Sequence, residues 1–157
     1  MSNIDQCRSI KELNPLCQIL LNQAIIEIKA EGINPLIVET YRSQARQNHL
    51  YNQGRTAPGI KVTWTQSSIH TKRNAVDIVP QRIVGGRMTA IWNANDKETK
   101  KIISIMTKYG FEAGANWTTS PDSPHFQIAG VSKTAKSYSL TNTNTFVTKV
   151  FQRLLNE

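Results

Sequence analysis

Hydrophobic positions divide the chain into helical and extended segments. Between residues 14 and 31 they recur every three or four residues, which predicts a helix with one wide apolar face in a core. Asn14 can cap this helix and Gly32 can end it. The apolar positions are Leu13, Leu16, Cys17, Leu20, Leu21, Ala24, Ile25 and Ile28.

Shorter patterns predict two more helices and several strands. Residues 43–53 and 96–109 carry helix caps and stops at their ends, and the inner face of the second is expected at Ile102, Ile103, Met106 and Tyr109. Strands are predicted for the apolar runs 35–40, 75–80 and 126–128, and a small hairpin for 82–88. Helices mixed irregularly with short strands predict an α+β domain, with a small antiparallel sheet flanked by helices.

The last part of the chain differs in composition. Residues 131–145 are rich in Ser, Thr and Asn and predict a surface connection, and 146–157 predict a C-terminal amphipathic helix. We expect a single domain at 1–130, with 131–157 docked on it. A helix that binds a partner or a membrane surface is the alternative.

Charge narrows the possible partners. The 157 residues carry a net charge of +8, which favours polyanions such as nucleic acid, anionic lipid or cell-wall polymers, although a solubilising surface remains open. The basic residues form no long block and no nucleic-acid motif, so no nucleic-acid partner is expected. No apolar run is long enough to span a membrane, and the N-terminus lacks a secretory signal. We therefore expect a monomer that stays in the cytoplasm until it is released.

The two cysteines do not indicate redox or structural zinc chemistry. Cys7 and Cys17 have neither the spacing nor the number for a disulfide framework or a zinc site. Cys17 falls on the apolar stripe of the first helix and is expected to be a buried free thiol.

Two polar segments beside predicted strands carry the candidate chemistry. His70 precedes Asp77 by seven residues, and Asp77 lies inside an apolar strand, where a buried carboxylate requires a cationic partner. Asp122 precedes His125 by three residues. Two imidazoles and one carboxylate give Zn²⁺ three ligands and leave a position for water, and a further carboxylate can then accept a proton. From spacing alone, three separately hydrogen-bonded polar residues are an equally good interpretation.

The arrangement of these segments resembles a known family. The Ser-x-His-(x)6-Asp pattern at Ser68, His70 and Asp77, followed by Trp117 and by Asp122, His125 and Phe126, is similar to zinc D-alanyl-D-alanine carboxypeptidases and L-alanyl-D-glutamate endopeptidases, which include phage endolysins. An upstream stretch that begins at Thr40-Tyr41-Arg42-Ser43 resembles a third block of the family.

The resemblance implies a role for each matching residue. His70, Asp77 and His125 would bind Zn²⁺, and Asp122 would be the general base. Arg42 would stabilise the substrate carbonyl or the developing oxyanion, and the cleft would be lined by Gln47, Ser68 and Trp117. One position departs from the pattern: Arg73 stands where the family usually has glycine. If that glycine needs a positive φ, Arg73 is strained or the turn is rebuilt.

The expected function follows from the resemblance. It implies hydrolysis of the peptide stems of peptidoglycan at the L-Ala–D-Glu bond, as a phage-type endolysin that reaches the wall after release at lysis. The basic surface would bind anionic wall or outer-membrane polymers. A D-Ala-D-Ala carboxypeptidase or dipeptidase of the same family is one alternative, and a non-catalytic basic module that binds the wall or nucleic acid is another.

Overall fold

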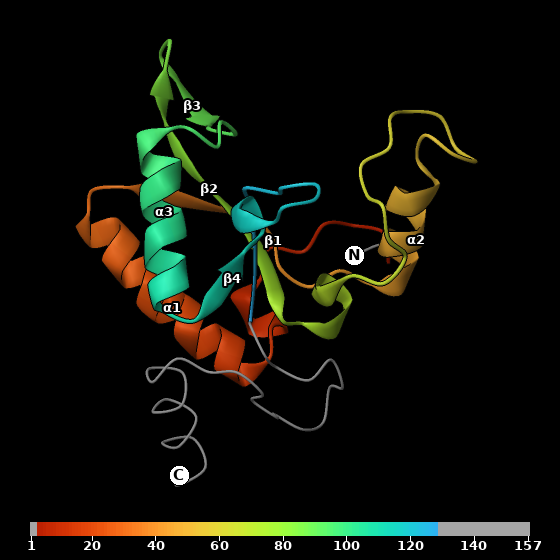
Figure 1. Ribbon diagram of the computed structural model, residues 1–157, viewed down its shortest axis with the longest axis horizontal. Helices are drawn as coiled ribbons and strands as arrows, with labels where there is room; N and C mark the ends of the chain where they lie inside the picture. Colours follow the sequence, from red (N-terminus) through yellow and green to blue (C-terminus); the bar gives the residue numbers. More distant parts are fainter. Residues whose placement is uncertain (1–2, 129–157) are drawn as a thin grey trace, which may run out of the picture.

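Five antiparallel strands pair into the sheet that organises residues 3–128, the part of the chain that the computed structural model describes (Figure 1). The strands lie in the order β1-β2-β5-β4, and β3 pairs with β2. Their bounds are Asn34–Glu39 (β1), Ala75–Val84 (β2), Arg87–Ala90 (β3), Phe111–Ala113 (β4) and His125–Ile128 (β5). The predicted α+β class with a small antiparallel sheet is confirmed. The predicted C-terminal segments lie outside the described residues.

Strand β2 pairs with three neighbours and so holds the sheet together. It is longer than predicted because it continues past residue 80 into the hairpin with β3. Gly85 and Gly86 form the tip of this hairpin at φ values of 56° and 79°, which a tight two-residue turn requires. The short strand β4 was not predicted; it follows directly after a helix and has only three residues.

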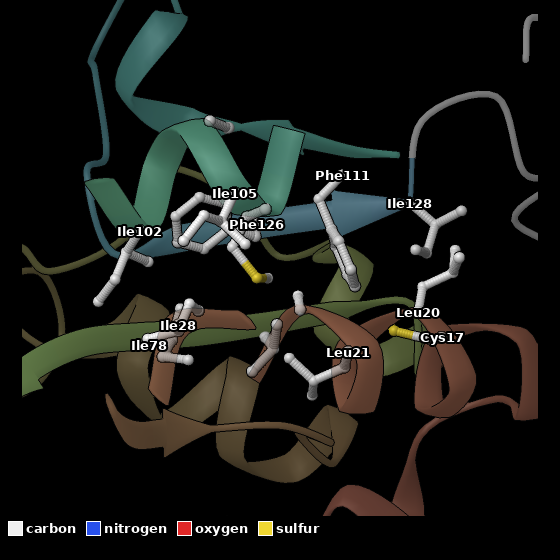
Figure 2. Close-up of a cluster of buried hydrophobic side chains, with 14 of the residues drawn as sticks. Cys17, Leu20, Leu21, Ile28, Ile78, Ile102, Ile105, Phe111, Phe126 and Ile128 are labelled. Carbon is white, nitrogen blue, oxygen red and sulfur yellow. The ribbon is translucent and has the colours of Figure 1, made fainter. Parts of the chain in front are cut away.

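Two helices, α1 (Pro15–Ala30) and α3 (Lys97–Lys108), pack side by side against one face of the sheet (Figure 1). Their apolar faces meet strand residues in the core shown in Figure 2. Cys17 is fully buried there as a free thiol, as predicted, and this burial raises its pKa to about 12. The core comprises Leu13, Leu16, Cys17, Leu20, Leu21, Ala24, Ile28, Ile33, Val76, Ile78, Ile102, Ile105, Met106, Phe111, Ala113, Phe126 and Ile128.

The helix starts agree with the predicted caps, with one difference. Asp96 accepts hydrogen bonds from the first turn of α3, as expected. Asn14 precedes α1, but its side chain donates to Lys72 O and Asn74 Oδ1 instead of capping the helix. Asn14 thus ties α1 to the segment that carries the candidate ligand His70. On α3, Ile105 is buried although the predicted inner face omitted it.

Helix α2 (Gln44–Asn52) lies apart from the other two helices, beyond the opposite side of the sheet (Figure 1). The Ser43 hydroxyl caps it by accepting from Arg46 N at 3.0 Å, as predicted. The segment after α2 runs as an irregular loop to the 3-10 turn η2 (Ile69–Lys72).

In residues 3–128 no helix is both long and apolar enough to cross a membrane.

Candidate metal centre and cleft

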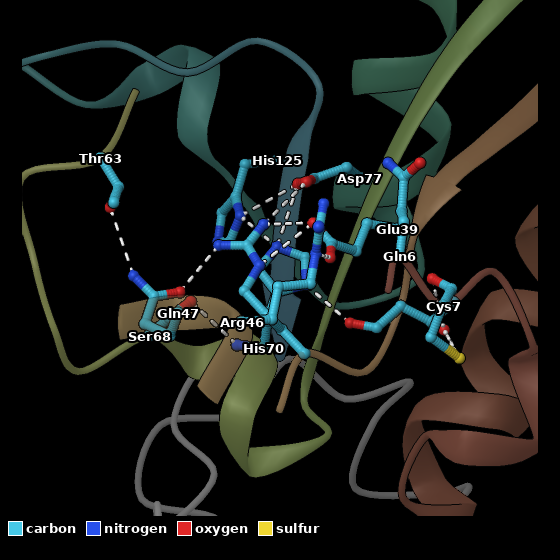
Figure 3. Close-up of polar contacts among 12 residues, drawn as sticks. Gln6, Cys7, Glu39, Arg46, Gln47, Thr63, Ser68, His70, Asp77 and His125 are labelled. Carbon is cyan, nitrogen blue, oxygen red and sulfur yellow. Dashed lines mark hydrogen bonds and ion pairs between the residues drawn. The ribbon is translucent and has the colours of Figure 1, made fainter. Parts of the chain in front are cut away.

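Strand pairing brings the three predicted metal ligands together. Asp77 on β2 is the register partner of His125 on β5, so the two side chains leave the same face of the sheet. The alternate residues Val76 and Phe126 enter the core on the other face. His70 comes from η2, which Ser68 caps by accepting from His70 N at 3.2 Å. In Figure 3 His70, Asp77 and His125 converge on one point.

The spacing of the facing atoms fits a tetrahedral metal ion. His70 Nε2 lies 3.1 Å from Asp77 Oδ1 and 3.2 Å from His125 Nδ1, and the third side of the triangle, between His125 Nδ1 and Asp77 Oδ1, is 3.3 Å. Ligands at about 2.0–2.1 Å from a tetrahedral zinc are roughly 3.3 Å from one another. The donor set and its dimensions therefore match what Zn²⁺ requires.

In each histidine the ring nitrogen that faces away from the triangle also has a hydrogen-bond partner. His70 Nδ1 lies 2.7 Å from the carbonyl oxygen of Thr40, which can only accept, so in the neutral ring the proton is on Nδ1 and Nε2 presents a lone pair. His125 Nε2 donates to Gln127 Oε1 at 3.0 Å, which leaves Nδ1 free of a proton. In their neutral forms both rings therefore present a lone pair toward the place of a metal ion, and a proton bound there instead is shared with Asp77.

Electrostatics keep the carboxylate ionised. Burial alone would raise the pKa of Asp77, but hydrogen bonds from His125 and His70 outweigh it and hold the pKa far below the usual range. Burial alone would lower the pKa of His125, but the hydrogen bond and charge of Asp77 raise it. The group thus offers an anionic oxygen and two imidazole nitrogens. A metal ion that binds there must compete with protons for the imidazole lone pairs.

Arg42 is a fixed cation beside this group. Its Nε and Nη2 donate to Glu39 Oε2 at 3.1 and 2.5 Å, and its Nη2 lies 3.7 Å from Asp77 Oδ2. Nη1 donates to Gln47 Oε1 at 2.9 Å. Within residues 3–128 these hydrogen bonds use three of the five guanidinium N–H groups, which leaves two for a bound substrate.

Gln47 does not line the cleft as expected. Its side chain is fully buried on α2, where it accepts from Arg42 and donates to Thr65 O at 2.6 Å. Figure 3 shows it between the metal-binding group and Thr63. Gln47 therefore positions Arg42 and one wall of the cleft, and it is not itself a wall residue.

Asp122 lies at the cleft wall beside His125. His125 N donates to Asp122 O at 3.2 Å, so a tight turn places the carboxylate near the ligand histidine. Asp122 is exposed as a residue, but partial desolvation in the cleft, followed by the charge of Asp77, raises the pKa of its carboxyl above the usual value. A raised pKa suits a group that must take up and release a proton.

Ser68 and Trp117 both line the cleft, in agreement with the predicted positions. The Trp117 ring centroid lies 5.1 Å from that of His125, and its indole N–H donates to Glu112 Oε1 at 2.7 Å. The cleft has a volume of about 640 Å³. Its walls are the segments 62–70 and 117–127, and the metal-binding group lies between them. This size is within the range of small-molecule and peptide sites.

Three further residues support the site and were not predicted. Glu39 is buried at the end of β1 and binds both Arg42 and Arg46. Gln127 orients His125 from two residues along β5. Gly114 packs under the turn at residue 122, where an added Cβ would lie 2.4 Å from Asp122 O. A side chain at position 114 would therefore displace the carboxylate.

Arg73, where the family usually has glycine, keeps the left-handed backbone. Its φ is 63° and ψ is 24° at the end of η2, so the turn is not rebuilt. The side chain pairs with Glu12 at 2.6 Å and lies 3.8 Å above the ring of Tyr41. These contacts offset part of the cost of a left-handed non-glycine residue.

Two substitutions separate the backbone strain at position 73 from the side-chain contacts. Arg73→Ala and Arg73→Gly both remove the contacts with Glu12 and Tyr41, but only alanine keeps a Cβ in the left-handed region. We expect Arg73→Gly to be more stable than Arg73→Ala by about 1 kcal/mol. Urea unfolding of both variants measures the difference, and equal stabilities would contradict the assigned strain.

The segment that carries the site matches a known peptidase family. A family model described as D-alanyl-D-alanine carboxypeptidase matches residues 61–128, which contain all three candidate ligands and Asp122. This match shows that residues 61–128 are similar to that family.

Two curated relatives are named as L-alanyl-D-glutamate peptidases. The peptidoglycan L-alanyl-D-glutamate endopeptidase CwlK of Bacillus subtilis is 34% identical over 107 residues, which cover 62% of this chain and 62% of CwlK. An L-alanyl-D-glutamate peptidase of a Listeria phage is 29% identical over 130 residues, which cover 74% of this chain and 42% of the relative. The chain thus spans less than two thirds of the length of either relative.

Solved structures support the fold. The L-Ala D-Glu endopeptidase ChiX of Serratia marcescens matches with a TM-score of 0.59 at 22% identity, covering 80% of this chain and 89% of ChiX. The LD-carboxypeptidase LdcB matches with a TM-score of 0.57 at 20% identity, covering 74% of this chain and 58% of LdcB. At these identities the likeness concerns the fold.

Proposed function

We propose that the protein is a zinc-dependent peptidase that hydrolyses the peptide stems of peptidoglycan at the L-Ala–D-Glu bond. The observation that carries this proposal is the triangle of His70, Asp77 and His125, with sides of 3.1–3.3 Å, at the base of a cleft that also holds Asp122. The names of CwlK and of the phage peptidase support the choice of bond.

Asp122 and Arg42 would have separate roles in the proposed reaction. When bound, Zn²⁺ would lower the pKa of a water molecule and polarise the scissile carbonyl. Asp122 would accept the proton from that water and deliver it to the leaving amine, a role that its raised pKa favours. Arg42, held by Glu39 and Gln47, would direct its two remaining N–H groups at the oxyanion.

A carboxypeptidase that removes a terminal D-amino acid is the second candidate. The description of the matching family model and the name of LdcB favour it. A non-catalytic basic module is less well supported, because such a module has no use for a carboxylate of raised pKa beside a complete ligand set.

Defined muropeptides distinguish these functions. We expect the purified protein to release the stem peptide between L-Ala and D-Glu, to lose this activity with a chelator, and to regain it with added Zn²⁺. Mass spectrometry of the fragments identifies the bond. Loss of only a terminal D-Ala would support the carboxypeptidase, and cleavage that survives complete metal removal would contradict the proposed chemistry.

The biological setting is also a proposal. The phage relative supports an endolysin that reaches the wall at lysis, and the net charge of +8 supports capture by anionic wall polymers.

A further inference from the structure

An exposed tryptophan stands on the wall of the cleft. Trp64 is 69% exposed and lines the cleft together with Val62, which is 50% exposed. Large apolar side chains this exposed usually have a binding role when they gather at one site. The other strongly exposed large apolar residues of the described chain do not line the cleft.

The backbone around Trp64 is held in place from both sides. Arg55 donates to Thr63 O at 3.1 Å on one side, and on the other the buried Gln47 donates to Thr65 O at 2.6 Å. Gln44 donates to Gln66 O at 2.9 Å. The ring is therefore presented by an ordered segment, which reduces the entropy lost when a ligand binds.

Two cations lie over the same ring, at the distance of weak cation–π contacts. The guanidinium carbon of Arg55 is 3.9 Å from the centroid of Tyr51 and 5.7 Å from that of Trp64, and Lys61 Nζ is also 5.7 Å from the Trp64 centroid. Arg55 thus links Trp64 to the end of α2. Most of the indole surface remains accessible for another planar or apolar ligand face.

The chemistry of the proposed substrate supplies such a face. In peptidoglycan the L-Ala amine is joined through a lactyl group to a sugar ring, so only about two residue lengths, roughly 7 Å, separate the L-Ala–D-Glu bond from the glycan. A peptide bound with this bond at the metal-binding group must place a sugar at the rim of the cleft. Pyranose rings have C–H faces that pack on exposed aromatic rings.

We propose that Trp64 is a sugar-binding platform of the cleft, which contacts the glycan next to the scissile bond. This inference rests on the proposed L-Ala–D-Glu activity. It assigns the 62–65 segment to the glycan side of the substrate. Peptides with and without their sugars should then be treated differently by this enzyme.

Two matched substrates test the platform. One is a disaccharide stem peptide, and the other is the same peptide with its N-terminus capped by lactate alone. We expect Trp64→Ala to lower kcat/KM on the disaccharide peptide about tenfold and on the lactyl peptide less than twofold, since an aromatic side chain truncated at a contact site typically costs about this factor. Trp64→Phe, which keeps an aromatic face, should retain most of the preference.

Trp92→Ala is the matched control, because Trp92 is 57% exposed and does not line the cleft. It should leave both substrates unaffected. Equal losses on both substrates with Trp64→Ala would show that Trp64 shapes the peptide site, and no loss on either would show an uninvolved surface residue; both results overturn the proposal.

A binding measurement keeps this test separate from the proposed activity. A peptide-free glycan oligomer, titrated into the wild-type protein and into Trp64→Ala with NMR detection, should bind only the wild type. If the wild type cleaves neither substrate but binds the glycan through Trp64, the choice of bond is wrong, and with it the placement of Trp64 beside the scissile bond, while glycan binding by Trp64 is retained. Absence of glycan binding to the wild type, with cleavage intact and no sugar preference, overturns the platform alone.

Discussion

Replacing His70 by alanine should reduce bound zinc to well below one ion per chain and lower the hydrolysis rate by about 10³-fold or more. The substitution removes one of three ligands from a site whose remaining ligands, Asp77 and His125, cannot fix a tetrahedral ion alone. Elemental analysis of the dialysed protein gives the stoichiometry, and muropeptide turnover gives the rate.

His49→Ala is the matched control, because His49 is exposed on α2 and is not part of the ligand group. It should keep full zinc and full activity. Circular dichroism shows whether His70→Ala has kept the fold, and His125→Ala provides an independent loss of one ligand. Full zinc occupancy in both ligand variants would exclude this centre as the metal site.

Asp122→Asn should separate metal binding from proton transfer. The amide keeps the shape of the side chain but cannot accept a proton, so zinc should stay bound while turnover falls by about 10²-fold or more. Parallel measurements of zinc content and of kcat on a muropeptide check this. If the variant works at nearly the normal rate, another group is the base.

Asp122→Glu provides the conservative comparison. It restores a carboxylate at a slightly different reach, so its activity should lie between those of the wild type and Asp122→Asn. Asp122→Asn and Asp122→Glu variants that are equally inactive would point to a shape requirement at this turn, where Gly114 leaves no spare space.

The candidate ligand residues could be named in advance because the sequence pattern around them resembles that of a known family, whereas spacing alone left separately hydrogen-bonded residues as an equally good interpretation. An aspartate inside an apolar strand and a histidine at the start of a strand are unusual local sequence patterns. Both can be recognised without knowing the fold. Their meeting could not be predicted from spacing alone. It depends on the pairing of Asp77 with His125 between strands almost fifty residues apart in the chain.

The roles of the supporting residues could not be predicted from the sequence, because they depend on tertiary structure. Glu39 is an ordinary acidic residue at a strand end until the fold places Arg42 and Arg46 around it. Gln47 was assigned to the cleft wall, but the orientation of α2 turns it inward. Gly114 shows its importance only when the turn at Asp122 is known to pack against it. No local pattern specifies these packing relations.

The contact between Trp117 and His125 places an intrinsic fluorophore next to a candidate metal ligand. Indole emission is quenched by a neighbouring imidazolium more than by a neutral imidazole, and a metal ion bound at His125 Nδ1 excludes the proton from that atom. We expect the contribution of Trp117 to the emission of the three tryptophans to change when a metal ion binds. Titrating Zn²⁺ into the protein should therefore change the tryptophan emission and report loading of the proposed centre without a chemical label.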